Sequence, residues 1–313
     1  MSYDESKPPA RRRFGRSSLT VAVTVLVPTA LAGWLVWQGA SGPGSGGPAA
    51  ATAATGTSAA AAPGVGDVAP GGTGPTGSRA ATESAAPAAR PLAGKVVVID
   101  PGHNPRNRDH TAEINKPVRI GTGSKECDTT GTATNGGYAE ARFTLDVSHR
   151  LRTLLQKQGA TVTFTHDNDR PFGPCVDERA RIGNRAKADA VVSVHADGSA
   201  AGNRGFHVIL PALVKGGGAD TTAIVGPSRK LGERVVDSFA RATGSAPSNY
   251  LGGGTGLDVR EDLGGLNLST VPKVFVECGN MRDSKDAALL TSAKWRQKAA
   301  RGLADGIGAF LAK

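Results

Sequence analysis

The sequence predicts one α/β domain whose mostly parallel, twisted sheet is covered by helices on both faces. Short runs rich in Val and Ile, typical of buried parallel strands, alternate along residues 91–313 with segments whose apolar residues recur every three or four positions, as in amphipathic helices. This alternation indicates parallel pairing, because each helix returns the chain to the start of the next strand. Roughly 220 residues are enough for a single domain with one substantial core.

The first predicted strand, 95–100, is a β-branched run that ends in a polar residue. The helix after it is predicted from a stripe of apolar side chains, which are Phe143, Val147, Leu151, Leu154 and Leu155. Gly159 ends this helix. The later strands are predicted at 161–165, 190–194, 206–210 and 273–277. The later helices are predicted at 176–187, 227–242 and 292–311.

Two long segments, 104–134 and 245–269, are rich in Gly, Asp, Asn and Thr and show no sustained periodicity. Long loops in compact domains are usually functional or disordered. In open parallel sheets the ligand lies beyond the carboxyl ends of the strands. We therefore expect both segments to be loops that cover a site at that edge.

The first 90 residues differ in composition from the rest of the chain. Residues 1–18 form a basic leader, expected to be cytoplasmic, and 19–38 carry no charge and are long enough to cross a membrane. Residues 19–38 are thus either a transmembrane signal-anchor or a signal peptide. Residues 39–90 are almost all Ala, Gly, Pro, Ser and Thr, which predicts a disordered linker. We expect the domain at 91–313 to be extracytoplasmic, tied to the membrane or secreted.

The formal net charge of +10 would suit a polyanionic partner. However, residues 91–313 contain no dense basic run interleaved with aromatic residues, so no nucleic acid partner is predicted. The sequence gives no indication of an oligomeric state.

Four residues able to bind a metal or transfer a proton are placed at one edge of the predicted sheet. His103 follows the first strand, Glu140 lies in the first turn of the next helix, and His195 and Glu277 end two later strands. Each has a structural explanation taken singly, such as a turn hydrogen bond or a carboxylate at a helix N-terminus. Two His and one Glu with an open fourth position are nevertheless the usual composition of a hydrolytic Zn²⁺ site. Their joint placement favours such a site.

Three stretches of the chain form an ordered set of motifs: Val-Ile-Asp-Pro-Gly-His at 98–103, the segment from Val-Asp-Glu-Arg to Ser-Val-His-Ala-Asp at 176–197, and Pro-Lys-Val-Phe-Val-Glu-Cys-Gly at 272–279. Taken together and in this order, they resemble the zinc-dependent N-acetylmuramoyl-L-alanine amidases of the Amidase_3 family. The likeness covers 95–313. It departs from the family pattern at Asn104-Pro105, where the family often has a second Gly after the first His, and at Gly279-Asn280, where the family often has Gly-Phe one residue after the catalytic Glu.

The resemblance implies that His103, Glu140 and His195 bind Zn²⁺ and that Glu277 is the catalytic glutamate. It implies cleavage of the amide between N-acetylmuramic acid and the L-alanine of the stem peptide, with peptidoglycan or muropeptide fragments as partners. The membrane would be a partner through 19–38, and the domain would act in the cell wall. Two alternatives remain: a zinc carboxypeptidase that trims stem peptides, and a non-catalytic wall-binding regulator on the amidase scaffold.

The remaining cysteines, histidines and Asp100 receive structural interpretations. Cys127 and Cys175 lie in loop-like segments of a domain facing an oxidising compartment, so a disulfide between them is expected. Cys278 follows a buried strand and is interpreted as a core residue. Asp100 either accepts a hydrogen bond from a ligand histidine or caps a turn. The histidines interpreted as structural or surface residues are His110, His149, His166 and His207.

Overall fold

The computed structural model describes residues 90–312, which contain a six-stranded sheet in the order β4-β1-β5-β10-β6-β9. Its strands are β1 (Val96–Pro101), β4 (Thr161–Phe164), β5 (Ala190–Asp197), β6 (His207–Pro211), β9 (Leu257–Arg260) and β10 (Lys273–Asn280). The first four in this order are parallel, β6 pairs antiparallel with β10, and β9 is parallel to β6. The predicted α/β fold with a mostly parallel sheet is confirmed.

The β-branched residues of β1 alternate between the two faces of the sheet. Val97 and Ile99 belong to the main core, whereas Val98 belongs to a smaller cluster on the other face, with Val191 of β5. Both faces of the strand are therefore apolar, as expected for a strand between two parallel neighbours. Asp100, next in the alternation, falls on the face with Val98 and pairs in register with Ser193.

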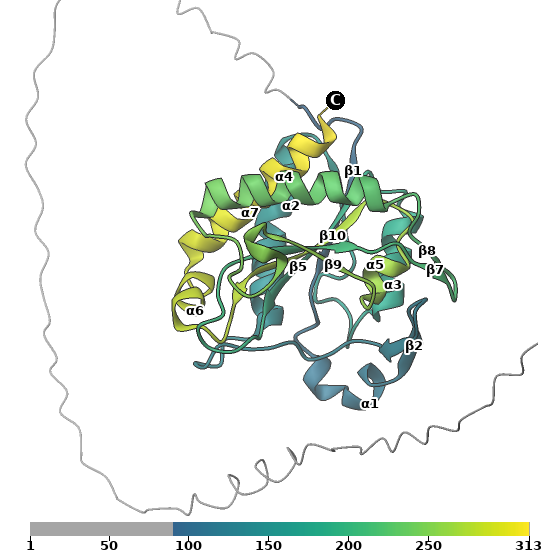
Figure 1. Ribbon diagram of the computed structural model, residues 1–313, viewed down its shortest axis with the longest axis horizontal. Coiled ribbons are helices and arrows are strands. Elements are labelled where there is room, and N and C mark those ends of the chain that lie inside the picture. The colour runs from purple at the N-terminus through teal and green to yellow at the C-terminus, as the bar shows by residue number, and fades with distance from the viewer. Residues whose placement is uncertain (1–89, 313) are drawn as a thin grey trace, which may run out of the picture. The chain divides into compact units, whose positions relative to one another are not determined.

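Helices cover both faces, but unequally (Figure 1). The main core lies under three long helices, α2 (Glu140–Lys157), α4 (Val225–Thr243) and α7 (Ala293–Leu311), of which α7 contacts both of the others. The other face carries α3 (Val176–Arg185) and the short α5 (Gly264–Asn267), which pack together. The thinner cover on this second face leaves room for a cavity.

The segment 104–134 packs beside the site, as expected, but contains α1 (Thr111–Ile114) and a hairpin of β2 (Pro117–Arg119) and β3 (Ser124–Glu126). The interpretation of 245–269 as a loop is wrong in part, because it contains β9 and α5. β9 is four residues long and forms one edge of the sheet, so it lacks the continuous apolar run of an inner strand. Three further short elements, not predicted, are β7 (Lys215–Gly216), β8 (Ala219–Asp220) and α6 (Ser284–Leu290).

The leader at 1–18, the apolar segment at 19–38 and, apart from Arg90, the linker at 39–90 lie outside the described residues. Within 90–312, none of the helices combines the length and the apolar character needed to span a bilayer.

A buried carboxylate joins several elements of the sheet. Asp100, 3% exposed, accepts hydrogen bonds from Arg179 of α3 at 2.8 Å, Lys273 of β10 at 3.0 Å, Ser193 of β5 at 2.5 Å and Thr165 at 2.7 Å. Burial opposes the charge, yet Lys273, Arg179 and the two hydroxyls hold the pKa of Asp100 well below its ordinary value. The carboxylate is therefore ionised and balanced by two buried cations.

We predict that Asp100→Asn lowers the free energy of unfolding by about 3–5 kcal/mol, because it removes the counter-charge of buried Lys273 and one of the two carboxylates that neutralise Arg179. The folded-state pKa of Asp100 is depressed, so its contribution to stability is complete above the unfolded-state value of 3.8 and is lost as the pH falls towards the folded-state pKa. Chemical denaturation of wild type and variant between pH 7 and pH 2 measures both effects. A difference under about 1 kcal/mol at pH 7 would contradict the prediction.

Candidate metal centre

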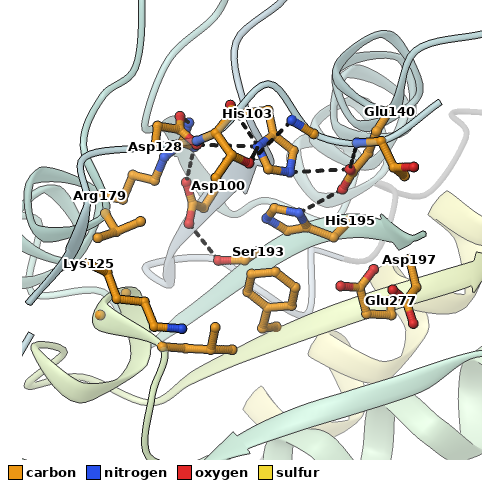
Figure 2. Close-up of a pocket in the computed structure, with 18 of the residues that line it drawn as sticks. Asp100, His103, Lys125, Asp128, Glu140, Arg179, Ser193, His195, Asp197 and Glu277 are labelled. Carbon is orange, nitrogen blue, oxygen red and sulfur yellow. Dashed lines mark hydrogen bonds and ion pairs between the residues drawn. The ribbon is translucent and has the colours of Figure 1, made fainter. Parts of the chain in front are cut away.

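Three of the four predicted site residues converge at the carboxyl edge of the sheet (Figure 2). Glu140 Oε2 lies 3.2 Å from His103 Nε2, and Glu140 Oε1 lies 2.9 Å from His195 Nδ1. The three side chains offer ligand atoms that all lie within 4.8 Å of one another. Two imidazole nitrogens and a carboxylate oxygen, directed at one point, form a donor set that fits a first-row metal ion such as Zn²⁺.

The close approach of β1 and β5 places the two histidines together. His195 is the sixth residue of β5, and its ring stacks on Phe275 of β10 with centroids 3.8 Å apart. His103 follows β1 with a φ of 59°, a left-handed conformation that turns the chain over the sheet edge. Gly102 allows the chain before His103 to pass close to the His195 ring, because a Cβ atom at position 102 would lie 2.3 Å from that ring.

Glu140 comes from the opposite face of the sheet. It is the first residue of α2, and its side chain points towards His103 and His195 (Figure 2). The backbone N–H groups of Thr132 and Ala196 donate to its carboxylate at 2.9 and 3.2 Å. Burial opposes its charge, but these donors and the two histidines favour it, and the pKa of Glu140 is held well below its ordinary value. Glu140 is therefore ionised and could serve as an anionic metal ligand.

The surroundings of His103 determine which of its nitrogens is free for a metal. Nδ1 lies 3.3 Å from Asp128 Oδ1 and 3.2 Å from the carbonyl oxygen of Thr129. Both oxygens are acceptors, so Nδ1 carries a hydrogen, and Nε2, which faces Glu140, is the nitrogen that would offer its lone pair to a metal ion. Burial works against a positive charge here, yet Glu140 and Asp128 raise the pKa of His103 well above its ordinary value.

Glu277 lies beside this cluster, in register with His195 on the neighbouring strand. Both Glu277 and the three candidate ligands line a cavity of about 500 Å³. The Oε2 atom of Glu277 is buried without a hydrogen-bond partner among residues 90–312. Burial, with the nearby carboxylates of Glu140 and Asp197, raises the pKa of Glu277 well above its ordinary value. The arrangement suits a group that takes up and releases a proton within the cavity.

The sequence interpretation of Asp100 is wrong, since Asp100 contacts neither histidine and forms the buried network with Arg179 and Lys273. The partner of His103 is Asp128, which sequence reasoning missed because nothing near it in the chain marks it. Tyr250 was also missed, and its hydroxyl donates at 2.6 Å to Oδ2 of Asp197, which lines the cavity. The expected disulfide between Cys127 and Cys175 is confirmed, as is the buried position of Cys278.

The comparisons with known proteins agree with this geometry. The family model described as N-acetylmuramoyl-L-alanine amidase matches residues 97–309. The chain belongs to this family. An N-acetylmuramoyl-L-alanine amidase of Mycobacterium tuberculosis is 44% identical over 223 residues, covering 71% of this chain and 88% of the relative. A probable cell wall amidase of Staphylococcus saprophyticus is 22% identical, covering 72% of this chain and 62% of the relative.

Among solved structures, the N-acetylmuramyl-L-alanine amidase of Mycobacterium smegmatis aligns with a TM-score of 0.65 at 41% identity. The alignment covers 70% of this chain and 98% of that one. The family and enzyme class expected from the sequence are confirmed.

The two departures from the family motifs have structural roles. Asn104 is buried and donates to the carbonyl oxygens of Arg170 and Gly173, which fixes the chain directly after His103. Asn280 donates to the carbonyl oxygens of Ser199, Ala200 and Asn203, and so holds the loop that follows β5. Both amides position backbone next to the site without replacing a candidate ligand.

We predict that Gly102→Ala weakens metal binding by at least about tenfold, because the added methyl group would displace the His195 ring. Gly136→Ala is the matched control, since a Cβ at Gly136 would find only Thr134 within 4 Å. Titration of the metal-free proteins with Zn²⁺ against a chromophoric chelator gives the affinities. Equal affinity in the two variants would show that the close approach at Gly102 does not matter for the site.

Proposed function

We propose that the chain hydrolyses peptidoglycan with a Zn²⁺ ion held by His103, Glu140 and His195, and with Glu277 as the general base. Family membership gives the reaction class, hydrolysis of the amide between N-acetylmuramic acid and L-alanine. The observation that carries the proposal is the arrangement of three convergent donors beside a glutamate whose buried Oε2 has no partner among the described residues. Three protein ligands and one exchangeable position are typical of catalytic zinc.

When bound, Zn²⁺ would lower the pKa of a water molecule towards about 7 and polarise the scissile carbonyl. The protein groups then have separate tasks. Glu277 accepts the proton of the attacking water and later donates it to the departing nitrogen of L-alanine, so that its carboxylate is regenerated. With Zn²⁺ bound, His103 and His195 would be neutral metal ligands, with Nδ1–H of His103 held by Asp128 and Thr129.

The two alternatives predict different properties. A zinc carboxypeptidase could use the same four residues but would release an amino acid from the end of the stem peptide. A non-catalytic regulator would be expected to lack a donor or the base, whereas the described chain keeps all four residues around one cavity. The family match favours the amidase.

We further propose that the domain acts outside the cytoplasm, in the cell wall, and that the membrane is a partner through 19–38. A relative described as a probable cell wall amidase and the disulfide between Cys127 and Cys175 support this location. The substrates would be peptidoglycan or muropeptide fragments.

We predict that Glu277→Gln binds Zn²⁺ normally but loses about 10²- to 10⁴-fold in rate, because Gln cannot accept the proton of the water. The matched variant Glu140→Gln should bind Zn²⁺ poorly and also be inactive, because it removes the anionic donor. Zinc content, thermal unfolding and cleavage of purified muropeptides are measured on both proteins.

Mass spectrometry of the products separates the reactions, since an amidase frees the intact stem peptide and a carboxypeptidase frees single amino acids. If Glu277→Gln cleaves within a few-fold of the wild-type rate, the assigned base is wrong.

We predict that protease added to intact spheroplasts degrades the domain at 91–313, because the uncharged segment at 19–38 exports it. A cytoplasmic marker protein must survive the same treatment. Full protection of the domain until the spheroplasts are lysed would place it in the cytoplasm and contradict the proposed location.

A further inference from the structure

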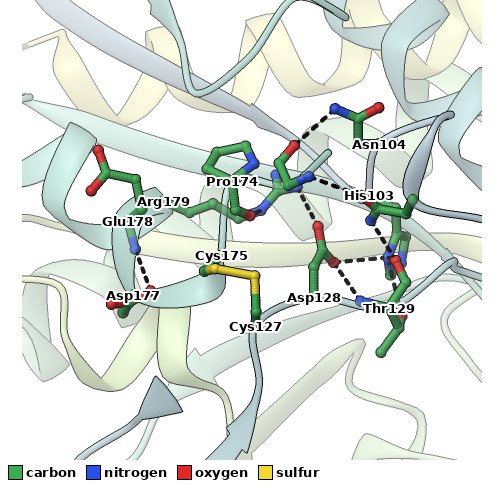
Figure 3. Close-up of a disulfide and its surroundings, with 12 residues drawn as sticks. His103, Asn104, Cys127, Asp128, Thr129, Pro174, Cys175, Asp177, Glu178 and Arg179 are labelled. Atoms are coloured by element: carbon green, nitrogen blue, oxygen red, sulfur yellow. Dashed lines mark hydrogen bonds and ion pairs between the residues drawn. A yellow bond between two sulfur atoms is a disulfide. The ribbon is translucent and has the colours of Figure 1, made fainter. Parts of the chain in front are cut away.

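Asp128 occupies a buried position between a candidate metal ligand and an arginine (Figure 3). One oxygen, Oδ1, lies 3.3 Å from His103 Nδ1, and the other, Oδ2, accepts from Arg179 Nη2 at 2.9 Å. Asp128 and Arg179 are each 5% exposed. The carboxylate is therefore shielded from solvent, and its orientation is set by His103, by Arg179 and by the backbone N–H of Thr129, which donates to Oδ1 at 2.8 Å.

Arg179 is itself fixed by several acceptors. Its Nη1 donates to Asp100 Oδ1 at 2.8 Å and to the carbonyl oxygen of Pro101 at 2.6 Å, and its Nε donates to the carbonyl oxygen of Pro174 at 2.8 Å. A planar guanidinium held at three edges is a rigid support. Arg179 thus aligns Asp128 with the end of β1, only two residues before His103.

The disulfide joins the two chain segments that carry this pair. Cys127 directly precedes Asp128, and Cys175 is the N-terminal flanking residue of α3, four positions before Arg179. The same segments are also joined by the backbone bond from Val176 N–H to the Cys127 carbonyl oxygen, at 2.7 Å. Apart from this junction, Asp128 lies in an irregular segment between β3 and α2. The covalent link keeps that segment against α3.

We propose that Asp128 is a positioning residue for metal binding, and that the Cys127–Cys175 disulfide acts through it. Asp128 accepts the Nδ1–H of His103, which fixes the tautomer and directs Nε2 at the metal. The disulfide and Arg179 hold Asp128 where it can do so. This inference rests on the proposed function only in taking His103 as a ligand.

The expected size of the effect follows from other metal sites, where removing the outer partner of a ligand histidine typically costs about 10- to 100-fold in affinity. Thr129 offers a second acceptor to Nδ1, so the loss of Asp128 weakens the site without abolishing it. Without the disulfide, the segment from Cys127 can move away from α3, and Asp128 then meets His103 for only part of the time.

The experiment measures the Zn²⁺ dissociation constant of the metal-free protein by competition with a chromophoric chelator, without substrate. Asp128→Asn should bind about 10- to 100-fold more weakly than wild type, and its Co²⁺-loaded form should show a shifted visible absorption spectrum. Asp262→Asn is the matched control. Asp262 lies in the same cavity wall and pairs with Lys125 and Arg260, but contacts none of the candidate ligands, and it should leave both readouts unchanged.

A double-mutant cycle tests the role of the disulfide. The pair Cys127→Ser and Cys175→Ser should weaken Zn²⁺ binding in the wild-type background but have little further effect in the Asp128→Asn background. Circular dichroism confirms that each variant is folded at the assay temperature. Should the serine pair fail to fold, Arg179→Lys replaces it, since Lys cannot bond Asp128, Asp100 and Pro101 together as the guanidinium does.

Affinity within about threefold of wild type for Asp128→Asn would overturn the inference, as would equal losses from the serine pair in both backgrounds. An unchanged Co²⁺ spectrum in Asp128→Asn, with weaker affinity, would indicate only general destabilisation and would also overturn it. Because the readouts need no substrate, they are separate from the proposed activity. Failure of the wild-type protein itself to bind Zn²⁺ would instead overturn the proposed function.

Discussion

The buried carboxylate of Asp100 is the interaction on which the site depends. It connects β1 to β5 through Ser193, to β10 through Lys273 and to α3 through Arg179. Its position under the carboxyl edge means that the strands carrying His195 and Glu277 are aligned by the same group that anchors the end of β1. A buried ion pair is poor evidence of net stability, because desolvation offsets most of the attraction. In this protein the main role of the Asp100 ion pairs is to align the strands that carry the site.

From this carboxylate a row of alternating charges extends to the candidate metal site. Lys273 contacts Asp100, Asp100 contacts Arg179, Arg179 contacts Asp128, and Asp128 contacts His103. Each buried charge has an opposite neighbour, which is the condition under which such charges are tolerated. The row also explains why the thinly covered face of the sheet can carry polar groups. The apolar core is concentrated under α2, α4 and α7, on the other face.

The sequence allowed prediction of those features that have local signals. Apolar periodicity predicted the main helices and the inner strands. The positions of His103, His195 and Glu277 at the ends of predicted strands marked them as candidate site residues. Edge strand β9 has no such run, and its pairing with β6 depends on contacts distant in the chain. The functions of Asp100 and Asp128 could not be assigned for the same reason. Asp128 meets Arg179, 51 positions away, and this proximity arises only when α3 has packed.

Glu140 and Glu277 show how one site gives two glutamates different roles. Glu140 accepts two backbone N–H groups and faces two imidazoles, so burial is outweighed and its pKa falls. Glu277 faces the carboxylates of Glu140 and Asp197 and leaves Oε2 without a partner among the described residues, so burial and repulsion act together and its pKa rises. When the environments of two titratable groups shift their pKa values in opposite directions, one group is suited to hold a fixed charge and the other to transfer a proton. The same residue type is thus suited to holding a metal at the start of α2 and to moving a proton at the end of β10.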